Sequence, residues 1–520
     1  NGLIEHTAAA TDPRFTVLQG SEIYGDNGLA LVAADSNLIG LNPAGVEARR
    51  IELFDHDDSA ANEDYYGNDV IAGGADDDVI FGQLGDDTIH GDGLFDGNAL
   101  ATLRETVVNS DVGGDDYIEG NGGGDTIYGG LGQDDIVGGS SSLYSLTTPE
   151  LRPDGADTIY GGNGDMIARN NDGLVNDAGD LIVTDSAQHA RDSDAIVGDN
   201  GNIFRLVGSD SGSLLSFNYD NYDPLKIVVR AIELLDYTPG GRDYSANATN
   251  DIGAGDTIRG QSGDEFIYGM VGNDVLFGDG QDDDLIGGYG HDWISGGTGQ
   301  DGILGDDGRI FTSRNSFIEP LNGLLTPTVE TFISTPGDIQ QATINVTNAL
   351  KKAVDLTPFN PVEGGNELSD PQYADDIIYG GLGSDFIHAG SGDDAISGAE
   401  ALPEYFANPY NPGNVLGYSA ITGEFSEYDE FLPLVRIVYN DSPYYADGAE
   451  FILNFDHTEG ELVGDVYSDG NDVIFGDLGN DWIVGGTGRD NLYGGWGDDL
   501  LNADDDLSTN NGLNDVPDTN

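Results

Sequence analysis

The sequence predicts an all-β fold in which blocks of a flattened parallel coil alternate with β-rich insertions. Three observations lead to this prediction. An acidic residue recurs every nine residues, an apolar residue follows it two places later, and glycines fill the turn between copies, as in GGYGHDWIS and GGTGQDGIL at 287–304. The chain of 520 residues contains 80 glycines and no cysteine, so no disulfide framework can hold the fold together.

The nine-residue period runs without a slip through six copies. Their acids are Asp256, Glu265, Asp274, Asp283, Asp292 and Asp301, and the apolar residues two places later are Ile258, Ile267, Leu276, Leu285, Ile294 and Ile303. The glycines predict a tight turn, because glycine adopts backbone angles that are closed to other residues. The apolar residue and its neighbours predict a short strand with one side chain pointing inward. Two units then form one turn of the coil, and successive turns pair their strands in parallel.

The same spacing recurs outside this block. The further acids in phase are Asp69, Asp78, Asp87, Asp116, Asp125, Asp134, Asp157, Asp376, Asp385, Asp394, Asp472, Asp481, Asp490 and Asp499. Between 161 and 198 the pattern degenerates. The copy GGNGDMIAR at 161–169 is one residue short before its acid, and Asp180 and Asp194 begin only fragments.

Stacking the turns would align the acids in two columns, one along each edge of the coil. Carboxylates about 5 Å apart repel each other by about 1 kcal/mol per pair even in water, so bare columns would force the coil apart. A cation between successive turns reverses the sign of this interaction. Carboxylate and carbonyl oxygens in a flexible turn suit calcium better than magnesium, and the histidines and cysteines that transition metals prefer are scarce or absent.

The copies resemble the glycine-rich nonapeptides of the RTX (repeats-in-toxin, hemolysin-type) family, which are calcium-binding repeats. The resemblance implies a right-handed parallel β-roll, the RTX solenoid, with multiple calcium ions between its turns. It implies that every in-phase acid named above supplies a carboxylate to calcium, although Glu265 departs from the aspartate rule. It also implies that carbonyl oxygens come from turn residues, namely Gly269, Gly287, Gly296, Gly380 and Gly485. Finally, it implies type I secretion from a Gram-negative-type bacterium and folding outside the cell.

The periodic blocks divide the chain, and sequences such as VGDNG at 197–201 and LGDDG at 304–308 mark where insertions begin. The helical spacing of apolar residues in NVTNALKKAVDL predicts one short helix at 345–356. We expect a β-rich N-terminal segment or cap at 1–65, β-roll blocks at 66–198 (degenerate after 161), a β-rich insertion at 199–250, β-roll at 251–308, an insertion with the short helix at 309–372, β-roll at 373–398, an aromatic-rich lobe at 399–468, β-roll at 469–506 and a polar tail at 507–520.

Charge excludes some partners. The net charge of −77 argues against a direct nucleic-acid role, because phosphate binding needs a basic face. No apolar run approaches the roughly 18 residues of a membrane span, so we expect no direct membrane insertion. No signal peptide is visible and the chain begins at Asn1, so we expect a piece of a longer or processed polypeptide.

No catalytic signature accompanies the repeats. The patterns HExxH, GxSxG and GxxxxGK[ST] are absent, and the repeat histidines His90, His291 and His388 are expected to face solvent. We therefore expect no enzyme activity and no catalytic residues. We expect instead an extracellular or cell-surface structural or adhesive protein that folds on calcium binding. It would associate with itself, or with cell-surface or extracellular-matrix components, as a surface layer, sheath, filament or adhesin. The alternative is the calcium-stabilised β-roll portion of a secreted enzyme or toxin whose catalytic domain lies elsewhere.

Overall fold

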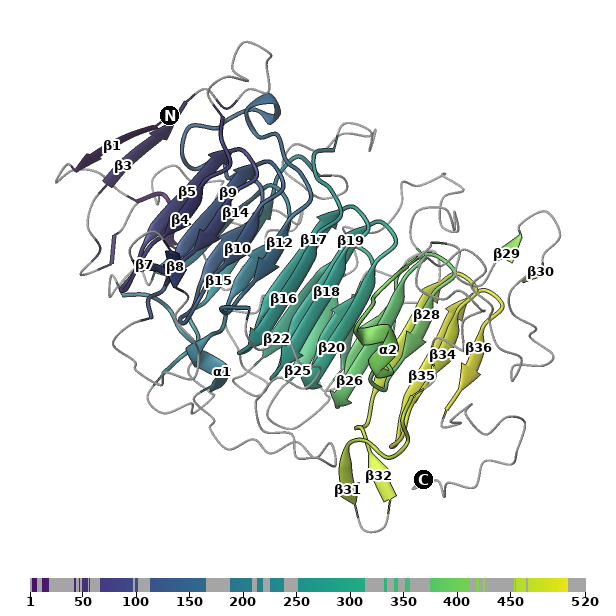
Figure 1. Ribbon diagram of the computed structural model, residues 1–520. Coiled ribbons are helices and arrows are strands. Elements are labelled where there is room, and N and C mark those ends of the chain that lie inside the picture. The colour runs from purple at the N-terminus through teal and green to yellow at the C-terminus, as the bar shows by residue number, and fades with distance from the viewer. Residues whose placement is uncertain are drawn as a thin grey trace.

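A parallel β-roll runs through the protein, whose structure here is a computed structural model (Figure 1). Two long sheets face each other, and every strand pair within them is parallel. The structure describes residues 2–6, 12–17, 42–43, 46, 49–54, 56, 66–96, 99–101, 113–164, 188–207, 213–217, 225–237, 251–313, 332–333, 341–344, 351–355, 375–411, 413, 418–419, 424–425, 453, 455–463 and 466–503.

Alternate nonapeptides contribute to alternate sheets, because each repeat supplies one strand and one turn. The eleven-stranded sheet contains β4 (Val70–Ala72), β6 (Thr88–His90), β10 (Thr126–Tyr128), β12 (Thr158–Tyr160), β16 (Thr257–Ser262), β18 (Val275–Gly280), β20 (Trp293–Gly299), β26 (Ile377–Gly383), β28 (Ala395–Ser397), β34 (Trp482–Val484) and β36 (Leu500–Asn502). The ten-stranded sheet contains β5 (Val79–Leu84), β9 (Tyr117–Gly122), β11 (Asp135–Val137), β13 (Ala195–Val197), β17 (Phe266–Val271), β19 (Asp284–Tyr289), β21 (Gly302–Leu304), β27 (Phe386–His388), β33 (Val473–Leu478) and β35 (Asn491–Trp496).

The predicted apolar residues form the core between the two sheets. Their side chains make one continuous cluster from Ile80 to Ile483, and those at the centre of the roll are fully buried. Strand pairing places them in register, for example Ile258 opposite Leu276 and Leu276 opposite Ile294. A narrow ladder of branched side chains is therefore the main hydrophobic core, as the period predicts.

The insertions leave the roll without breaking its register. Ile294 on β20 pairs with Ile378 on β26, although a long insertion separates the two repeats in the sequence. The degenerate stretch behaves in the same way, since Ile136 on β11 pairs with Ile196 on β13. The prediction of separate roll blocks is therefore refined: the blocks stack into one roll, and β13 (Ala195–Val197), at the end of the degenerate stretch, continues it.

Where the chain leaves the roll to form an insertion, the carboxylate of an aspartate accepts backbone N–H groups of the roll segments that follow. The carboxylate of Asp199 accepts the N–H groups of Ala254, at 3.0 Å, and Val271, at 2.7 Å, so it joins the returning chain to the next turn. Asp92 does the same for Gly114 and Leu131 at an earlier exit. These contacts explain why Gly-Asp precedes an insertion, since the side chain satisfies backbone groups that would otherwise lack a partner.

The insertions and the N-terminal segment form small sheets of their own. These comprise β1 (Gly2–His6) with β3 (Arg49–Leu53), β7 (Leu94–Asp96) with β8 (Ala99–Ala101), β2 (Phe15–Val17) with β14 (Gly201–Val207) and β15 (Arg230–Leu234), β22 (Arg309–Ser313) with β23 (Phe332–Ile333), β24 (Gln341–Ile344) and β25 (Lys351–Asp355), β29 (Tyr418–Ser419) with β30 (Glu424–Phe425), and β31 (Glu461–Val463) with β32 (Val466–Ser468). The described helices are α1 (Gln188–Arg191), α2 (Pro403–Phe406) and a 3₁₀ turn at Pro149–Leu151.

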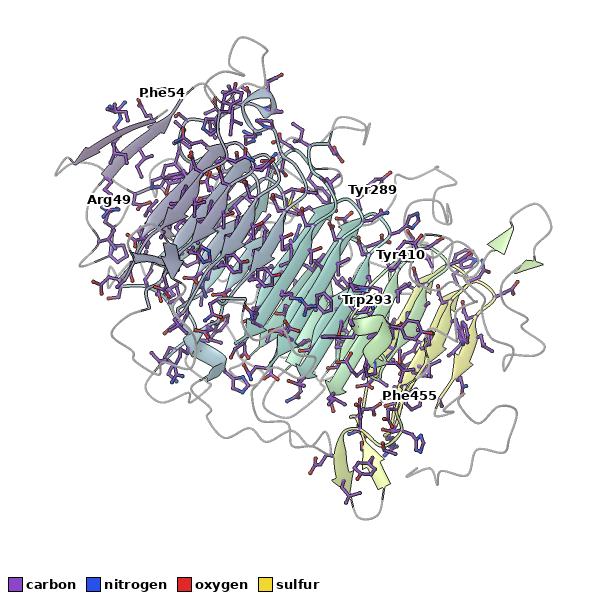
Figure 2. The ribbon with its side chains drawn as sticks, in the orientation of Figure 1. Arg49, Phe54, Tyr289, Trp293, Tyr410 and Phe455 are labelled. Atoms are coloured by element: carbon purple, nitrogen blue, oxygen red, sulfur yellow. The ribbon has the colours of Figure 1, made fainter. Side chains whose placement is uncertain are left out.

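The insertions cover the outer faces of both sheets. Ile203, Ile232 and Val354 from two insertions pack on outward-facing residues of the ten-stranded sheet, such as Tyr268 and Ile286. On the eleven-stranded sheet, the ring of Trp293 (labelled in Figure 2) packs edge-on against Phe406 of α2, and Phe455 belongs to the same buried cluster. The outer side chains of the roll are thus buried beneath insertions in its central part.

The predicted helix at 345–356 is wrong in the part that the structure describes. Lys351–Asp355 form β25, which pairs with β22 and β24 in an antiparallel sheet. The apolar Ala353 and Val354 are buried there against the roll. Pairing with partner strands outweighs the weak helical spacing of so short a segment, and residues 345–350 lie outside the described residues.

Candidate metal sites between the turns

Each clean repeat brings a carboxylate and a carbonyl oxygen to the same small space beside its first glycine. A Cβ atom added to Gly287 would lie 2.4 Å from Asp292 Oδ2 and 2.4 Å from the carbonyl oxygen of Gly305, one turn further along the roll. Both distances are shorter than any ordinary carbon contact. The absence of a side chain at Gly287 therefore leaves a cradle lined by oxygen atoms from two turns.

One oxygen of most repeat carboxylates accepts a hydrogen bond from the backbone of the preceding turn. The N–H of Asp256 donates to Asp274 Oδ1 at 2.7 Å, and the N–H of Asp274 donates to Asp292 Oδ1 at 2.8 Å. The same bond links the repeats across an insertion, from the N–H of Asp292 to Asp376 Oδ1. These bonds orient the carboxylates that accept them so that Oδ2 turns into the cradle.

The second oxygen is buried without a hydrogen-bond partner along most of the roll. This holds for Oδ2 of Asp87, Asp116, Asp125, Asp134, Asp157, Asp194, Asp256, Asp274, Asp283, Asp292, Asp301, Asp376, Asp385, Asp394, Asp472 and Asp481, and for both carboxylate oxygens of Glu265. A buried carboxylate oxygen without a hydrogen-bond partner is costly, and two columns of such oxygens fit a ligand of positive charge.

Without a cation, the burial and mutual repulsion of the carboxylates in each column raise their pKa values. Burial raises the pKa of Asp274 and of Asp385 to about 7. Burial and the neighbouring Asp274 carboxylate raise the pKa of Asp292 well above its ordinary value. A dication in the cradle would offset both causes, because it replaces lost solvation and separates like charges.

The donor set fits calcium. The cradles offer carboxylate and carbonyl oxygens and no nitrogen or sulfur, which is the chemistry of a hard cation. A family profile for the RTX calcium-binding nonapeptide repeat matches residues 65–96, 112–142, 154–165, 253–285, 277–309, 373–400 and 467–507. The chain carries RTX calcium-binding nonapeptide repeats. No curated protein sequence matches it.

The RTX repeats bind calcium ions. The structure places each carbonyl oxygen that was predicted as a calcium ligand beside a predicted carboxylate. The carbonyl oxygen of Gly269 faces Asp256, that of Gly287 faces Asp274, that of Gly296 faces Asp283, that of Gly380 faces Asp301 and that of Gly485 faces Asp472. Each pair joins two successive turns. This arrangement supports the ligand assignment, which we retain as a proposal for the individual residues.

The predicted acids form two columns, one along each edge of the RTX roll. One column contains Asp69, Asp87, Asp125, Asp157, Asp256, Asp274, Asp292, Asp376, Asp394, Asp481 and Asp499. The other contains Asp78, Asp116, Asp134, Glu265, Asp283, Asp301, Asp385, Asp472 and Asp490. The place of the first glycine in the Asp69 repeat lies outside the described residues.

The sequence prediction missed one member of the second column. Asp194 Oδ1 accepts the N–H of Asp134 at 2.7 Å, and Asp194 Oδ2 lies in the cradle of Gly161 with the carbonyl oxygen of Gly260. The sequence signal was present, because Asp194 is followed by Ile196 and by a glycine, as in a clean repeat. The chain between Gly161 and Asp194 is long enough to hide the period.

A second hydrogen-bond ladder, also missed, explains the frequent Asp or Asn just before the repeat acid. There the N–H of Asp282 donates to Asp264 Oδ1, at 3.0 Å, and the N–H of His291 donates to Asn273 Oδ1, at 3.1 Å. In these bonds the N–H of a later turn donates to a side chain of the turn before it. In the bonds of the repeat acids, the N–H of an earlier turn donates to a carboxylate of the turn after it. Consecutive acids in the RTX repeats thus have different tasks.

Two repeat histidines are buried, so their predicted exposure is wrong. His90 stacks on Tyr128 with ring centroids 4.3 Å apart, and His388 stacks on Phe475 at 4.3 Å. His388 Nδ1 also lies 2.8 Å from Asp477 Oδ2. His291 is half-buried, and its Nδ1 accepts the N–H of Asp375. Stacked rings on successive strands are the physical reason, because outward residues of one sheet face neighbours in register.

Within the described ranges, no helix is both long and apolar enough to cross a membrane.

Proposed function

We propose that this calcium-binding β-roll protein is an extracellular structural or adhesive element that folds on calcium binding and associates with itself at a cell surface. The continuous columns of cradles are the main support. Calcium joins every turn of the roll to the next, so the free calcium concentration would decide whether the roll is folded. Such a switch suits a chain exported from a calcium-poor cell into a calcium-rich medium.

Exposed apolar side chains support self-association. Tyr493 and Trp496 on β35 and Leu501 on β36 are exposed, with 57% of Trp496 accessible to solvent. Large aromatic residues at protein surfaces are frequent anchors of protein–protein contacts. The proposal includes no catalytic role, because the patterns HExxH, GxSxG and GxxxxGK[ST] are absent from the sequence.

The ligand assignment is tested by calcium counting. We expect the calcium-depleted chain to lose its β-sheet circular dichroism and to regain it with millimolar calcium. Asp274→Asn keeps an acceptor for the N–H of Asp256 but replaces the cradle oxygen, so equilibrium dialysis should count fewer bound ions. Asp86→Asn is the control, because Asp86 belongs to the second ladder. An equal loss in both variants would refute the assignment.

Self-association is tested on the calcium-loaded chain by sedimentation velocity and electron microscopy. We expect assemblies that form only in the presence of calcium. The double change Tyr493→Ser and Trp496→Ser should weaken them. Leu462→Ser is the control, because Leu462 is 50% exposed on the separate hairpin β31–β32. A monomer at all calcium concentrations would contradict the structural role. Turnover in a panel of hydrolase substrates would favour the alternative of a secreted enzyme.

A further inference from the structure

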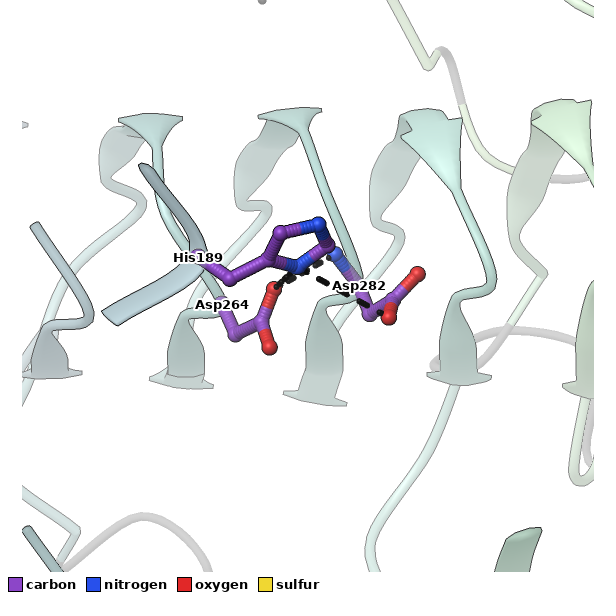
Figure 3. A group of neighbouring side chains, drawn as sticks. All are labelled: His189, Asp264 and Asp282. Carbon is purple, nitrogen blue, oxygen red and sulfur yellow. Dashed lines mark hydrogen bonds and ion pairs between the residues drawn. The ribbon is translucent and has the colours of Figure 1, made fainter. Parts of the chain in front are cut away.

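One histidine faces two carboxylates of successive turns (Figure 3). His189 Nδ1 lies 2.7 Å from Asp264 Oδ1 and 3.8 Å from Asp282 Oδ2. The three ligand atoms lie within 4.8 Å of one another. Asp264 and Asp282 belong to the second ladder, one place before the proposed calcium ligands, so their side chains lie outside the calcium cradles.

Hydrogen bonds to the backbone of α1 fix the position of His189 without involving its imidazole ring. The N–H of Asp264 donates to the carbonyl oxygen of His189 at 3.2 Å, and Gln133 Nε2 donates to the carbonyl oxygen of Ala190 at 2.6 Å. The side chain of Ala190 is fully buried and clusters with Ile227 and Phe217 of the insertion at 199–250. Because α1 is fixed on the roll by these contacts, the ring and the two carboxylates form a preorganised group.

The two carboxylates are likewise oriented by the roll. Asp264 Oδ1 accepts the N–H of Asp282, and Asp282 Oδ1 accepts the N–H of Gln300 at 2.8 Å. Asp282 Oδ2 therefore remains on the side of the imidazole (Figure 3). His388 offers a comparison, because its ring stacks on Phe475 and its Nδ1 lies beside one carboxylate, that of Asp477. A second carboxylate distinguishes His189.

We propose that His189, Asp264 and Asp282 form a binding site for a transition-metal dication, distinct from the calcium cradles. One imidazole nitrogen with two carboxylate oxygens is a donor set suited to zinc, whereas calcium prefers oxygen ligands alone. The side chains of His189 and Asp282 are 15% and 14% exposed, so an ion can reach the group and water can complete its coordination. The bound ion would pin α1 across two turns of the roll.

The test uses zinc and the full chain in excess calcium, so that the calcium cradles are filled. Isothermal titration should show one zinc site, and Co²⁺ in its place should give visible d–d absorption. His189→Gln should abolish the site. Asp282→Asn keeps the acceptor for the N–H of Gln300 and should weaken zinc binding at least tenfold. Calcium stoichiometry and circular dichroism should stay unchanged in both variants, which separates this site from the proposed calcium function.

Two controls decide the outcome. Asp86→Asn removes an acid of the second ladder that has Asn68 rather than an imidazole beside it, and His457→Gln removes a histidine outside the roll. Both should bind zinc as the unmodified chain does. Absence of a zinc site in the unmodified chain would overturn the proposal. So would an equal weakening by Asp86→Asn, which would mean that zinc binds surface carboxylates in general.

Discussion

A glycine at the first place of the repeat is required by the cradle rather than by backbone angles alone. Gly287 is not in the left-handed region, yet a methyl group there would meet the oxygens of Asp292 and Gly305. Ala389 occupies the same place in the repeat of Asp394, and its side chain is fully buried in the ladder core. The strand of that repeat still pairs in register, Ile378 with Ile396, so alanine is compatible with the roll.

We therefore expect Gly287→Ala to fold in calcium but to bind fewer calcium ions. The added methyl group fills the space where the two oxygens converge, and overpacking of a tight site costs about 1–3 kcal/mol. Equilibrium dialysis and thermal unfolding in calcium measure the two effects. Gly67→Ala is the matched control, because a Cβ there would meet no atom within 4 Å. Calcium binding equal to that of the unmodified chain would show that the cradle of Gly287 holds no ion.

At the scale of elements, the few basic residues attach insertions to the acidic roll. The chain has only 18 Lys and Arg against 95 Asp and Glu. Arg205 on β14 and Arg230 on β15 both contact Asp135 on β11, at 2.5 and 3.0 Å. Lys352 on β25 contacts Asp284 on β19 at 2.6 Å. These cations lie where an insertion meets the outer face of the ten-stranded sheet, so they also fix its position.

We expect Arg205→Met to loosen the insertion at 199–250. Burial opposes ionisation of Asp135, but the guanidinium groups of Arg205 and Arg230 hold its pKa below the ordinary value. Removing one partner of a buried ion pair costs about 3–5 kcal/mol, which urea unfolding in saturating calcium would measure. Arg50→Met is the control, since its pair with Glu52 is exposed and contributes about 1 kcal/mol or less. Similar losses in both variants would contradict this docking role.

The sequence predicted the roll because its ladder and its acids follow a strict local period. Ile258 to Ile303 lie in the core as expected, and the acids of the same copies form the two columns. What the sequence did not predict depends on contacts between distant segments. Val17 pairs with Val207, and Ile310 pairs with Val354, without any local pattern that reveals the partner. Asp194 was missed for another reason: Ile196 and Gly198 follow it as in a clean repeat, but the degenerate stretch isolates this copy from the regular period.

At the scale of the whole molecule, the acids make folding conditional. The net charge of −77 is carried by a chain whose central carboxylates lie buried in two stacked columns. Without a cation these groups can be accommodated only if many of them are protonated, since ionised neighbours repel and lack solvation. Calcium and protons therefore compete for the same carboxylate oxygens, and either can reduce the repulsion between the carboxylates of a column.

The calcium-free roll should consequently lose stability as the pH rises. The pKa of Asp274 and of Asp385 is raised by burial from 3.8 to about 7. A carboxyl group with a higher pKa in the folded chain contributes stability below its unfolded pKa, and this contribution is lost as the pH rises through about 7. We expect calcium-depleted chain to show more β-sheet circular dichroism at about pH 5 than at about pH 8. Calcium should reverse this order, because it binds the ionised carboxylates and is displaced by protons. A calcium-free chain that is better folded at the higher pH would show that the buried columns do not control folding.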